Sequence, residues 1–418
     1  MFASWLAHPK WSSAEKVFRR IRKAGHQVYF AGGCVRDGHL GRTPLDFDLA
    51  SSASPDEVES LFEKIRDPGR LFGTVVVVQD GFEVEVTEFR QDVGVRDGRR
   101  PLAVRAASAA EDAARRDFTV NALFWDLEQE ITLDYVGGLA DLKSRRIRAV
   151  GDPETRFAED HLRILRALRF SAQLDFCIEE DTWRSLKLAS PLLIRISGER
   201  LQVEFRKWIE ARRPDRLGEL IDSGVLSSLF PWNSKQSWSW DGEAKAGSLE
   251  LAFWAAFLSG QEKHLWELAE RLRFSRGFRR DLEKTSLWTS GSWIQESDEH
   301  LLELLWDPVH WAWVQELRSE PIDRYGGLGV AETLVGSRVG ELAYDRLLRL
   351  AKVRDRWMEK PRPWVQARDL PITGILLGKI LKKTYAAQLL GAVQSREQAL
   401  EFAHVQLHEE SGSGEYDP

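Results

Sequence analysis

The chain has 418 residues, of which 43% are hydrophobic and 30% are charged, and its formal net charge is -6. This length predicts two or more domains, and no apolar run reaches the roughly 18 residues of a transmembrane helix, so we expect no membrane partner. Two cysteines are too few for a disulfide framework or a zinc cluster, which favours a cytoplasmic location. This net negative charge excludes the class of proteins that coat nucleic acid. It does not exclude RNA binding through a local basic surface.

The first part of the chain alternates strand and helix signals. Segments 27–33 and 46–50 (QVYFAGG and DFDLA) are typical of short strands, and Ser54, followed by proline and acidic residues, predicts the start of a helix. Two further β-rich runs, 74–79 and 82–89, surround a glycine turn. The pattern predicts a small mixed α/β domain in which one face of a sheet carries acidic residues.

The later part of the chain is predicted to be mostly helical. The polar, basic, glycine-containing segment 91–112 is typical of a mobile loop, and apolar residues recur at helical spacing from Leu162 to Ala172. From Lys352 to Lys383, nine basic residues stand against three acidic ones, a local balance of +6. Such a run is usually a solvated helix face, although it would also suit RNA.

The segment most informative about chemistry is Asp46-Phe47-Asp48, which twelve residues separate from the glycine pair Gly32-Gly33. In a strand, residues i and i+2 point to the same side, so we expect the two carboxylates to project together. Like charges this close resist joint ionisation unless a cation lies between them, and Mg²⁺ prefers one or two carboxylates plus substrate phosphates. Glycines let a backbone approach a triphosphate closely. Taken alone, the pair could equally be two surface acids.

A third acid strengthens the interpretation as a metal-dependent nucleotide site. Glu85 lies on the polar side of the alternating run 82–89. We expect Asp46 and Asp48 to bind Mg²⁺, and Glu85 to position or deprotonate a 3′-hydroxyl nucleophile for an in-line displacement. Arg36 is expected to reach a phosphate through charge-assisted hydrogen bonds.

Two later clusters are also candidates for nucleotide contacts. The first, 115–122 (RRDFTVNA), could contact a nucleotide sugar, or it could form a helix N-terminus with a surface arginine pair. In the second, 159–163 (EDHLR), Asp160 and Arg163 are neighbours if they share a helix. An acceptor beside a donor would pair with cytosine or adenine and reject uracil and guanine, whose pattern is reversed. The plainer alternative is an intrahelical ion pair worth about 0.2–0.5 kcal/mol.

Successive motifs of the chain resemble those of class II tRNA nucleotidyltransferases, the family that includes CCA-adding, CC-adding and A-adding enzymes and bacterial poly(A) polymerases. The resemblance covers roughly residues 27–210, with motifs in the family's order: AGGCVRDGHLGRTPLDFDLA, FGTVVVV, EVTEFR, DGRRP, RRDFTVNAL, DYVGGLADLKSRRIRAVGDPETRFAEDHLRILRALRFSAQL and ERLQVEF. It implies an α+β fold, with an N-terminal nucleotidyltransferase head of mixed sheet and helices followed by an all-α neck, body and tail.

The resemblance also implies a division of the chain. The expected parts are a catalytic head (1–150), a helical neck that recognises the base (151–210), a helical body (211–340), a helical tail that binds tRNA (341–407) and a disordered end (408–418). The Trp-rich stretch 230–313 matches no motif of the family. No protein partner is implied.

Roles for single residues follow from the same resemblance. Asp46 and Asp48 match the family's metal ligands, and Glu85 falls where its third carboxylate lies. The residues implied to bind the nucleotide are Gly32, Gly33, Arg36, Arg116, Asp117, Asn121, Asp160, Arg163, Arg166 and Arg169. The implied reaction is attack by a tRNA 3′-hydroxyl on the α-phosphate of CTP or ATP, with Mg²⁺ as cofactor and pyrophosphate as product.

Several activities within and beyond the family stay open. The FGTV form resembles the tRNA enzymes rather than the poly(A) polymerases, which usually carry a basic RRF-type stretch there, and the DGRRP segment favours retention of the A-adding step. Addition of the whole CCA end is therefore preferred to addition of A only, and both to poly(A) synthesis. A catalytically inactive RNA-binding protein is disfavoured because Asp46, Asp48 and Glu85 are all present. A nucleotide sensor that does not bind RNA is disfavoured by the basic tail segment.

Overall fold

The chain forms two compact units. The computed structural model describes residues 2–69, 73–96, 100–233, 249–258, 261–289, 350, 355 and 363–412. One unit comprises Met1–Lys235 with Arg271–Arg273, and the other comprises Gln236–Glu270 with Phe274–Pro418. The expected boundaries at 150 and 210 fall inside the first unit, and the one at 340 lies outside the described residues, so these finer divisions stay predictions.

A seven-stranded mixed sheet forms the centre of the first unit. Its strand order is β3-β4-β5-β2-β1-β8-β9. The strands are β1 (Val28–Ala31), β2 (Asp48–Ser51), β3 (Ile65–Gly69), β4 (Thr74–Gln79), β5 (Phe82–Glu88), β8 (Leu123–Asp126) and β9 (Ile131–Asp134). Neighbouring strands are antiparallel except β2 and β5, which are parallel. A parallel pair needs a long crossover connection, which here runs through α4 (Pro55–Leu61), β3 and β4.

The alternation expected in the acidic strand is confirmed. In β5, Val84 and Val86 are buried, whereas Glu83 and Glu85 are exposed. Because successive side chains of a strand point to opposite faces, this pattern fixes which face of the sheet meets the core. Glu85 therefore lies on the solvent-accessible side, as its place in the sequence predicted.

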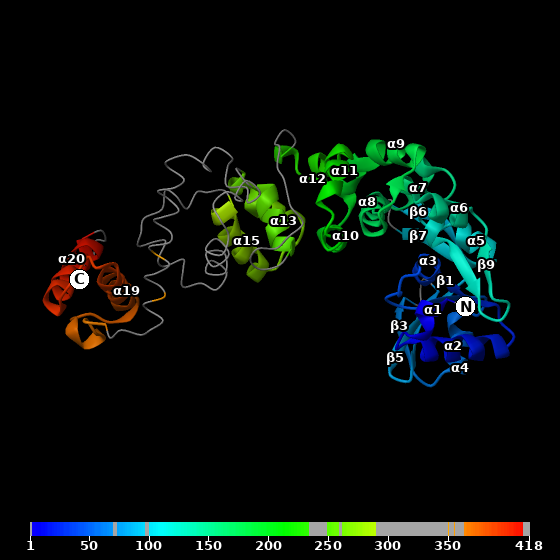
Figure 1. Ribbon diagram of the computed structural model, residues 1–418, viewed down its shortest axis with the longest axis horizontal. Coiled ribbons are helices and arrows are strands. Elements are labelled where there is room, and N and C mark those ends of the chain that lie inside the picture. The colour runs from blue at the N-terminus through cyan, green and yellow to red at the C-terminus, as the bar shows by residue number, and fades with distance from the viewer. Residues whose placement is uncertain are drawn as a thin grey trace. The chain divides into compact units, whose positions relative to one another are not determined.

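Among the helices of the first unit, α2 packs directly against β1, β4 and β5, and α3 contacts β1 and β8 (Figure 1). The helices are α1 (Ala3–Leu6), α2 (Trp11–Lys23), α3 (Gly33–His39), α4, α5 (Ala109–Ala114), α6 (Gly138–Ser144), α7 (Pro153–Glu159), α8 (Arg163–Leu174), α9 (Glu180–Ala189), α10 (Gly198–Ile209), α11 (Leu217–Asp222) and α12 (Val225–Leu229). The apolar face of α2 is buried, and Phe18 stacks on Phe30 with 5.5 Å between ring centroids. Aromatic burial of this kind contributes a large part of a core.

The predicted start of α4 is confirmed at Ser54. The Ser54 hydroxyl accepts a hydrogen bond from the Glu57 backbone N–H, and the Glu57 carboxylate accepts one from the Ser54 N–H. This capping box satisfies two backbone donors that the first turn leaves unpaired. The helical spacing after Leu162 is also confirmed, because Leu165, Leu168 and Ala172 are buried in α8.

Residues 91–112 do not form the loop that we predicted. β6 (Arg90–Arg96) and β7 (Arg100–Ala106) pair as a separate antiparallel hairpin, and α5 follows after a capping box formed by Ser108 and Glu111. A hairpin of this kind is held by backbone hydrogen bonds, which polar side chains do not oppose. The polar composition of the segment therefore concealed its strands.

After residue 235 the described secondary structure is helical. The helices are α13 (Leu249–Leu258), α14 (Leu265–Arg271), α15 (Arg276–Thr289), α19 (Gly374–Leu390) and α20 (Arg396–Gly412). Apolar side chains of α19 and α20, among them Ile380, Ala399 and Ala403, form one buried cluster. Most of the predicted body beyond Thr289, and much of the Trp-rich stretch, lies outside the described residues. In the described part of the chain, no helix combines the length and the apolar character needed to span a bilayer.

The last helix continues past the point where disorder was expected. α20 ends at Gly412, so 408–412 are helical, whereas 413–418 lie outside the described residues. Lys379 and Lys383 of α19 form ion pairs with Glu410, at 2.7 and 3.0 Å. These contacts tie the final turn to the preceding helix, and polar composition alone could not reveal them.

Candidate active site

A polar cleft of about 510 Å³ lies in the first unit. Most of the residues predicted to form the site line it: Gly32, Gly33, Arg36, Asp48, Glu85, Arg116, Asp117, Asn121, Asp160, Arg163 and Arg166. Asp46 and Arg169 are not among its lining residues. Segments that are far apart in the sequence thus meet around one hollow, among them β2, β5, α8 and the junction between α7 and α8.

Two of the three predicted acids lie opposite each other in the sheet. In the parallel pairing of β2 with β5, Asp48 is directly opposite Glu85. Burial against the cleft wall and the charges of Glu85 and Asp46 raise the pKa of Asp48 to about 6, although its side chain still meets solvent in the cleft. Desolvation also raises the pKa of Glu85. We call Asp46, Asp48 and Glu85 the acid cluster.

Asp46 does not lie in a strand, contrary to our prediction. β2 begins only at Asp48, and Asp46 belongs to the segment before it. The Asp46 side chain is 63% exposed and pairs with Lys10, which precedes α2. The Coulombic effects of Asp46 on Asp48 and Glu85 show that it is nevertheless close to both.

The acid cluster has the ligand chemistry of a magnesium site but is not a complete cage. Among the described residues, no group of three His, Cys, Asp or Glu side chains is arranged to hold a metal ion by itself. Mg²⁺ usually keeps several waters and binds through one or two carboxylates together with substrate phosphates. Asp48 and Glu85, side by side on the cleft wall, with Asp46 nearby, fit that kind of open site.

The glycine turn at Gly32 brings the backbone into the cleft beside the guanidinium group of Arg116. Gly32 has a φ of 73° and precedes α3, and a Cβ at this position would lie 3.0 Å from Nη1 of Arg116. Glycine alone adopts this conformation without strain and allows so close an approach. Arg36 of α3 is buried and donates a 2.6 Å hydrogen bond from Nη1 to Oδ1 of Asn121.

A buried carboxylate orients the arginine pair that follows α5. Asp112 is 1% exposed and accepts hydrogen bonds from both Arg115 and Arg116. Its burial alone would raise the pKa of its carboxyl, but the two guanidinium charges outweigh this and lower the pKa. Arg116 also donates to the backbone carbonyl of Asn121. The arginine pair is therefore a structured part of the site and not a loose surface pair.

Asp117 forms an ion pair with Arg166 across the cleft floor. Its Oδ2 accepts hydrogen bonds of 2.8 and 2.6 Å from Nε and Nη2 of Arg166, and its Oδ1 accepts from the Asn121 side chain. Burial would raise the pKa of Asp117, but the charge and hydrogen bonds of Arg166 lower it to about 2. Two residues predicted to contact the sugar are thus joined to Arg166, which was predicted only to bind the nucleotide.

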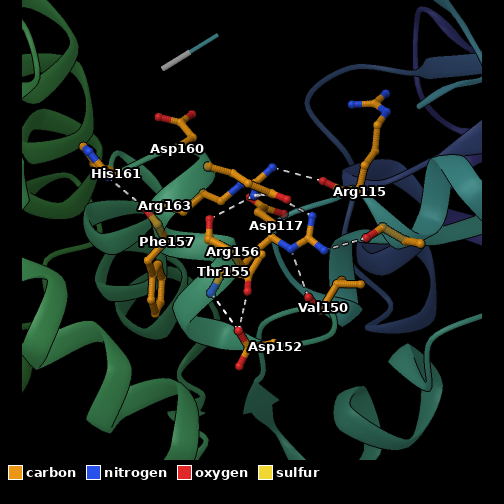
Figure 2. A network of polar contacts seen from close by, with 12 residues as sticks. Arg115, Asp117, Val150, Asp152, Thr155, Arg156, Phe157, Asp160, His161 and Arg163 are labelled. Carbon is orange, nitrogen blue, oxygen red and sulfur yellow. Dashed lines mark hydrogen bonds and ion pairs between the residues drawn. The ribbon is translucent and has the colours of Figure 1, made fainter. Parts of the chain in front are cut away.

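Asp160 and Arg163 do not share a helix, contrary to our prediction. α7 ends at Glu159, Asp160 has extended backbone angles (φ -143°, ψ 104°), and α8 begins at Arg163. Arg163 donates to the Glu159 carboxylate and to backbone carbonyls of Arg156 and Arg115, whereas the Asp160 carboxylate stands apart from this network (Figure 2). The two side chains still line the same cleft, but different contacts fix each of them.

Arg169 does not line the cleft but contacts residues that do or that lie next to them. It is buried, donates to Glu204 at 2.6 Å, and lies with its guanidinium carbon 3.9 Å from the centroid of the Phe170 ring. Glu204 is also 3.8 Å from Nη1 of Arg166. The predicted direct contact between Arg169 and a nucleotide stays untested, and the contacts present suit a supporting role.

Several residues of the site were not singled out from the sequence. Thr74, Thr87 and Arg90 line the cleft, and Lys10, Asp112, Arg200 and Glu204 contact its predicted members. A signal existed for Asp112, which precedes the arginine pair at the helical spacings i+3 and i+4. No spacing rule connects Lys10 to Asp46 or Arg200 to Asp160.

Comparison with known proteins identifies the family. A model described as the Poly A polymerase head domain matches residues 28–148, and one described as the probable RNA and SrmB-binding site of polymerase A matches 175–234. A CCA-adding enzyme of Bacillus velezensis is 43% identical over 215 residues, which are 51% of this chain and 54% of that protein. One of Leuconostoc citreum is 38% identical over 278 residues, which are 65% of this chain and 69% of that protein. The matched segment thus spans from about half to about two thirds of these relatives.

Solved structures show the same fold. The crystal structure of a Bacillus stearothermophilus CCA-adding enzyme in complex with CTP is 26% identical, with a TM-score of 0.63 over 97% of this chain and 100% of that one. A CCA-adding enzyme in complex with ATP is 22% identical, with a TM-score of 0.67 over 99% and 98%. The chain described here belongs to the family of tRNA nucleotidyltransferases and poly(A) polymerases that contains the CCA-adding enzymes.

Proposed function

We propose that this protein adds the CCA end to tRNA without a nucleic-acid template, using CTP and ATP and releasing pyrophosphate. The observation that carries this proposal is the meeting of Asp48 and Glu85, in register on adjacent strands, with four of the six arginines that line the cleft. We call these arginines the arginine wall: Arg36, Arg116, Arg163 and Arg166. A cleft with carboxylates on one side and guanidinium groups on the other suits a nucleoside triphosphate and the divalent ion that accompanies it.

The arginine wall is suited to hold the triphosphate and the sugar. Guanidinium groups bind phosphate oxygens through charge-assisted hydrogen bonds, and the glycine turn at Gly32 brings the backbone close to the same space. Asp117 and Asn121 are fixed by hydrogen bonds to Arg166 and Arg36 before any ligand binds. A site arranged in advance loses less entropy when the nucleotide is positioned.

The acid cluster is suited to the reacting end of the nucleotide. Nucleotidyltransferases of this family generally use a divalent metal, and Asp46 and Asp48 would hold Mg²⁺ here. When bound, Mg²⁺ would offset the negative charge of the α-phosphate. Glu85 would accept a hydrogen bond from the attacking 3′-hydroxyl and orient it for in-line displacement of pyrophosphate. Asp48 and Glu85 lie on adjacent strands of the sheet, which favours a fixed geometry for the two oxygens that exchange.

Selection of the base is assigned to Asp160 and Arg163. The Asp160 carboxylate accepts a hydrogen bond from an exocyclic amino group, and Arg163 donates to the adjacent ring nitrogen. Cytosine and adenine both present this amino group beside an unprotonated nitrogen, whereas uracil and guanine present the opposite pattern. Asp160 and Arg163 are each held by their own contacts, so both can face the base without contacting each other.

The test is incorporation into tRNA transcripts that lack A, CA or the whole CCA. The purified protein is incubated with Mg²⁺ and each transcript, with CTP, ATP or both. Complete CCA synthesis on the shortest transcript supports the proposal. Addition of A only, and only to the transcript ending in CC, would identify an A-adding enzyme instead, and long A tails would identify a poly(A) polymerase. Absence of any incorporation would contradict enzymatic function.

A further inference from the structure

We propose that Arg200 of α10 is a positioning residue that fixes the Asp160 carboxylate for selection of the base. This proposal rests on the function proposed above and names a specificity determinant for it. Arg200 comes from a different helix, forty residues along the chain from Asp160. It is not among the residues that line the cleft, so it acts on the nucleotide only through Asp160.

The backbone at Asp160 gives the side chain little support of its own. Asp160 lies between the end of α7 and the start of α8, in an extended conformation. A residue inside a helix is held by the turns on either side, but a residue in a two-helix junction depends on its own contacts. The carboxylate is oriented by Nη2 of Arg200, which lies 3.0 Å from Oδ2 and 3.2 Å from Oδ1, and by the Leu162 N–H, 3.1 Å from Oδ1.

In this orientation the Asp160 carboxylate keeps an acceptor position that is open to a base. Each carboxylate oxygen can accept about two hydrogen bonds. Within the described residues, Oδ1 receives the Leu162 N–H and a share of Arg200, whereas Oδ2 receives Arg200 alone. Oδ2 therefore keeps an acceptor position for an exocyclic amino group. A carbonyl oxygen of uracil or guanine at that place would put acceptor against acceptor.

The form of the contact predicts which replacements can work. A single nitrogen of Arg200 reaches both oxygens, while Nη1 is buried and has no hydrogen-bond partner among the described residues. The forked geometry that distinguishes arginine from lysine is therefore not used toward Asp160. Both side chains are only about a quarter exposed, at 26% and 24%, so solvent screens the pair less than it screens a surface ion pair. One ammonium group should replace much of the contact.

The experiment compares Arg200→Met, Arg200→Lys and the wild type. The kcat/KM values for CTP, ATP, UTP and GTP are measured on a transcript lacking CCA, together with the thermal midpoint of each protein. We expect Arg200→Met to raise incorporation of UTP relative to CTP by about tenfold or more, as when a hydrogen-bonding site loses its alignment. Arg200→Lys should recover most of the selectivity. Arg184→Met is the matched control, since Arg184 forms an exposed ion pair with Asp181.

The outcomes separate this inference from the proposed function. Equal loss of activity with all four nucleotides, or no recovery by lysine, would overturn the positioning role and leave only a structural one. If Arg200→Met unfolds, Arg200→Ala, which also removes the donor, takes its place, and unchanged selectivity in that variant would equally overturn the proposal. Failure of the wild type to incorporate CTP or ATP would contradict the proposed function and with it this inference, whereas wild-type activity with unaltered selectivity in every variant would contradict this inference alone.

Discussion

The acid cluster and the arginine wall face the same cleft, yet their charges are balanced in opposite ways. Burial and neighbouring carboxylates raise the pKa of Asp48 to about 6. Asp117, which contacts the arginine wall, is also buried, but Arg166 lowers its pKa to about 2. The carboxylates on the sheet repel one another and favour an added cation, whereas those beside the arginines are already neutralised by the protein. We therefore expect an added cation to balance the charge of the acid cluster, whereas Arg166 already balances the charge of Asp117.

The largest effect should come from removing a carboxylate that depends on an added cation. Asp48→Asn is expected to lower kcat for nucleotide incorporation by about 10²–10³-fold, which is typical for loss of one preorganised electrostatic group. Its thermal midpoint without metal should stay the same or rise, because a repulsive charge is removed. Glu83→Gln changes the neighbouring exposed acid of β5 and should leave activity unchanged. Full activity in Asp48→Asn would show that the Asp48 carboxylate is not needed for catalysis.

On the other side of the cleft, loss of a carboxylate should cost stability. Asp117→Ala leaves Arg166 partly buried without its main partner and is expected to lower the free energy of unfolding by about 3 kcal/mol in urea titrations. Asp175→Asn is the control, since Asp175 also has a pKa of about 2 but pairs with arginines at the surface, and asparagine tolerates its φ of 61°; this change should cost about 1 kcal/mol or less. Similar losses of unfolding free energy in the two variants would contradict the idea that the buried pair of Asp117 matters more than the surface pair of Asp175.

The pH dependence of stability should distinguish the two carboxylates by sign. Asp117 has a folded-state pKa below its unfolded value of 3.8, so the stability it contributes is present above about pH 4 and is lost as the pH falls toward 2. Asp48 has a folded-state pKa above that value, so in EDTA its protonation should add stability as the pH falls from about 7 to about 5. The measurement is the difference in unfolding free energy between wild type and Asp48→Asn across this range. A difference that does not change with pH would mean that burial and the neighbouring carboxylates do not raise the pKa of Asp48.

The smallest effect concerns the lysine that already contacts the acid cluster. Lys10 pairs with Asp46, so Lys10→Met should let Mg²⁺ bind a few-fold more tightly, as expected for loss of an ion pair worth up to about 1 kcal/mol. Binding can be followed through the rise of the thermal midpoint with Mg²⁺ concentration. Lys16→Met, which removes the exposed pair with Asp80, is the control. Weaker binding of Mg²⁺ by Lys10→Met would instead indicate that Lys10 helps to hold Asp46 in the position that binds the ion.

Sequence patterns predicted most of the residues around the cleft but not how they are held. The alternation of β5 predicted the side on which Glu85 lies, and the capping signal at Ser54 predicted where α4 begins. Both depend on interactions within a few residues, which local sequence records directly. The resemblance to a family supplied the remaining candidates.

The errors share a different physical cause. Asp160 and Arg163 have the spacing of neighbours on a helix, but that spacing carries no information about a helix boundary between them. The hairpin at 90–106 depends on backbone pairing between its two strands, which the side-chain pattern of either strand does not record. The contacts of Lys10 and Arg200 join residues 36 and 40 positions apart, and only the folded chain defines them.

The parallel pairing of β2 with β5 has a consequence for the newly made chain. Asp48 and Glu85 become neighbours only after α4, β3 and β4 have formed the connection between their strands. A nascent chain that has not yet extended through β5 carries one acid without the other, and so has no place for a divalent ion to bridge them. Uptake of the ion during synthesis would therefore report the pairing of β2 with β5, before β8 and β9 are added to the same sheet.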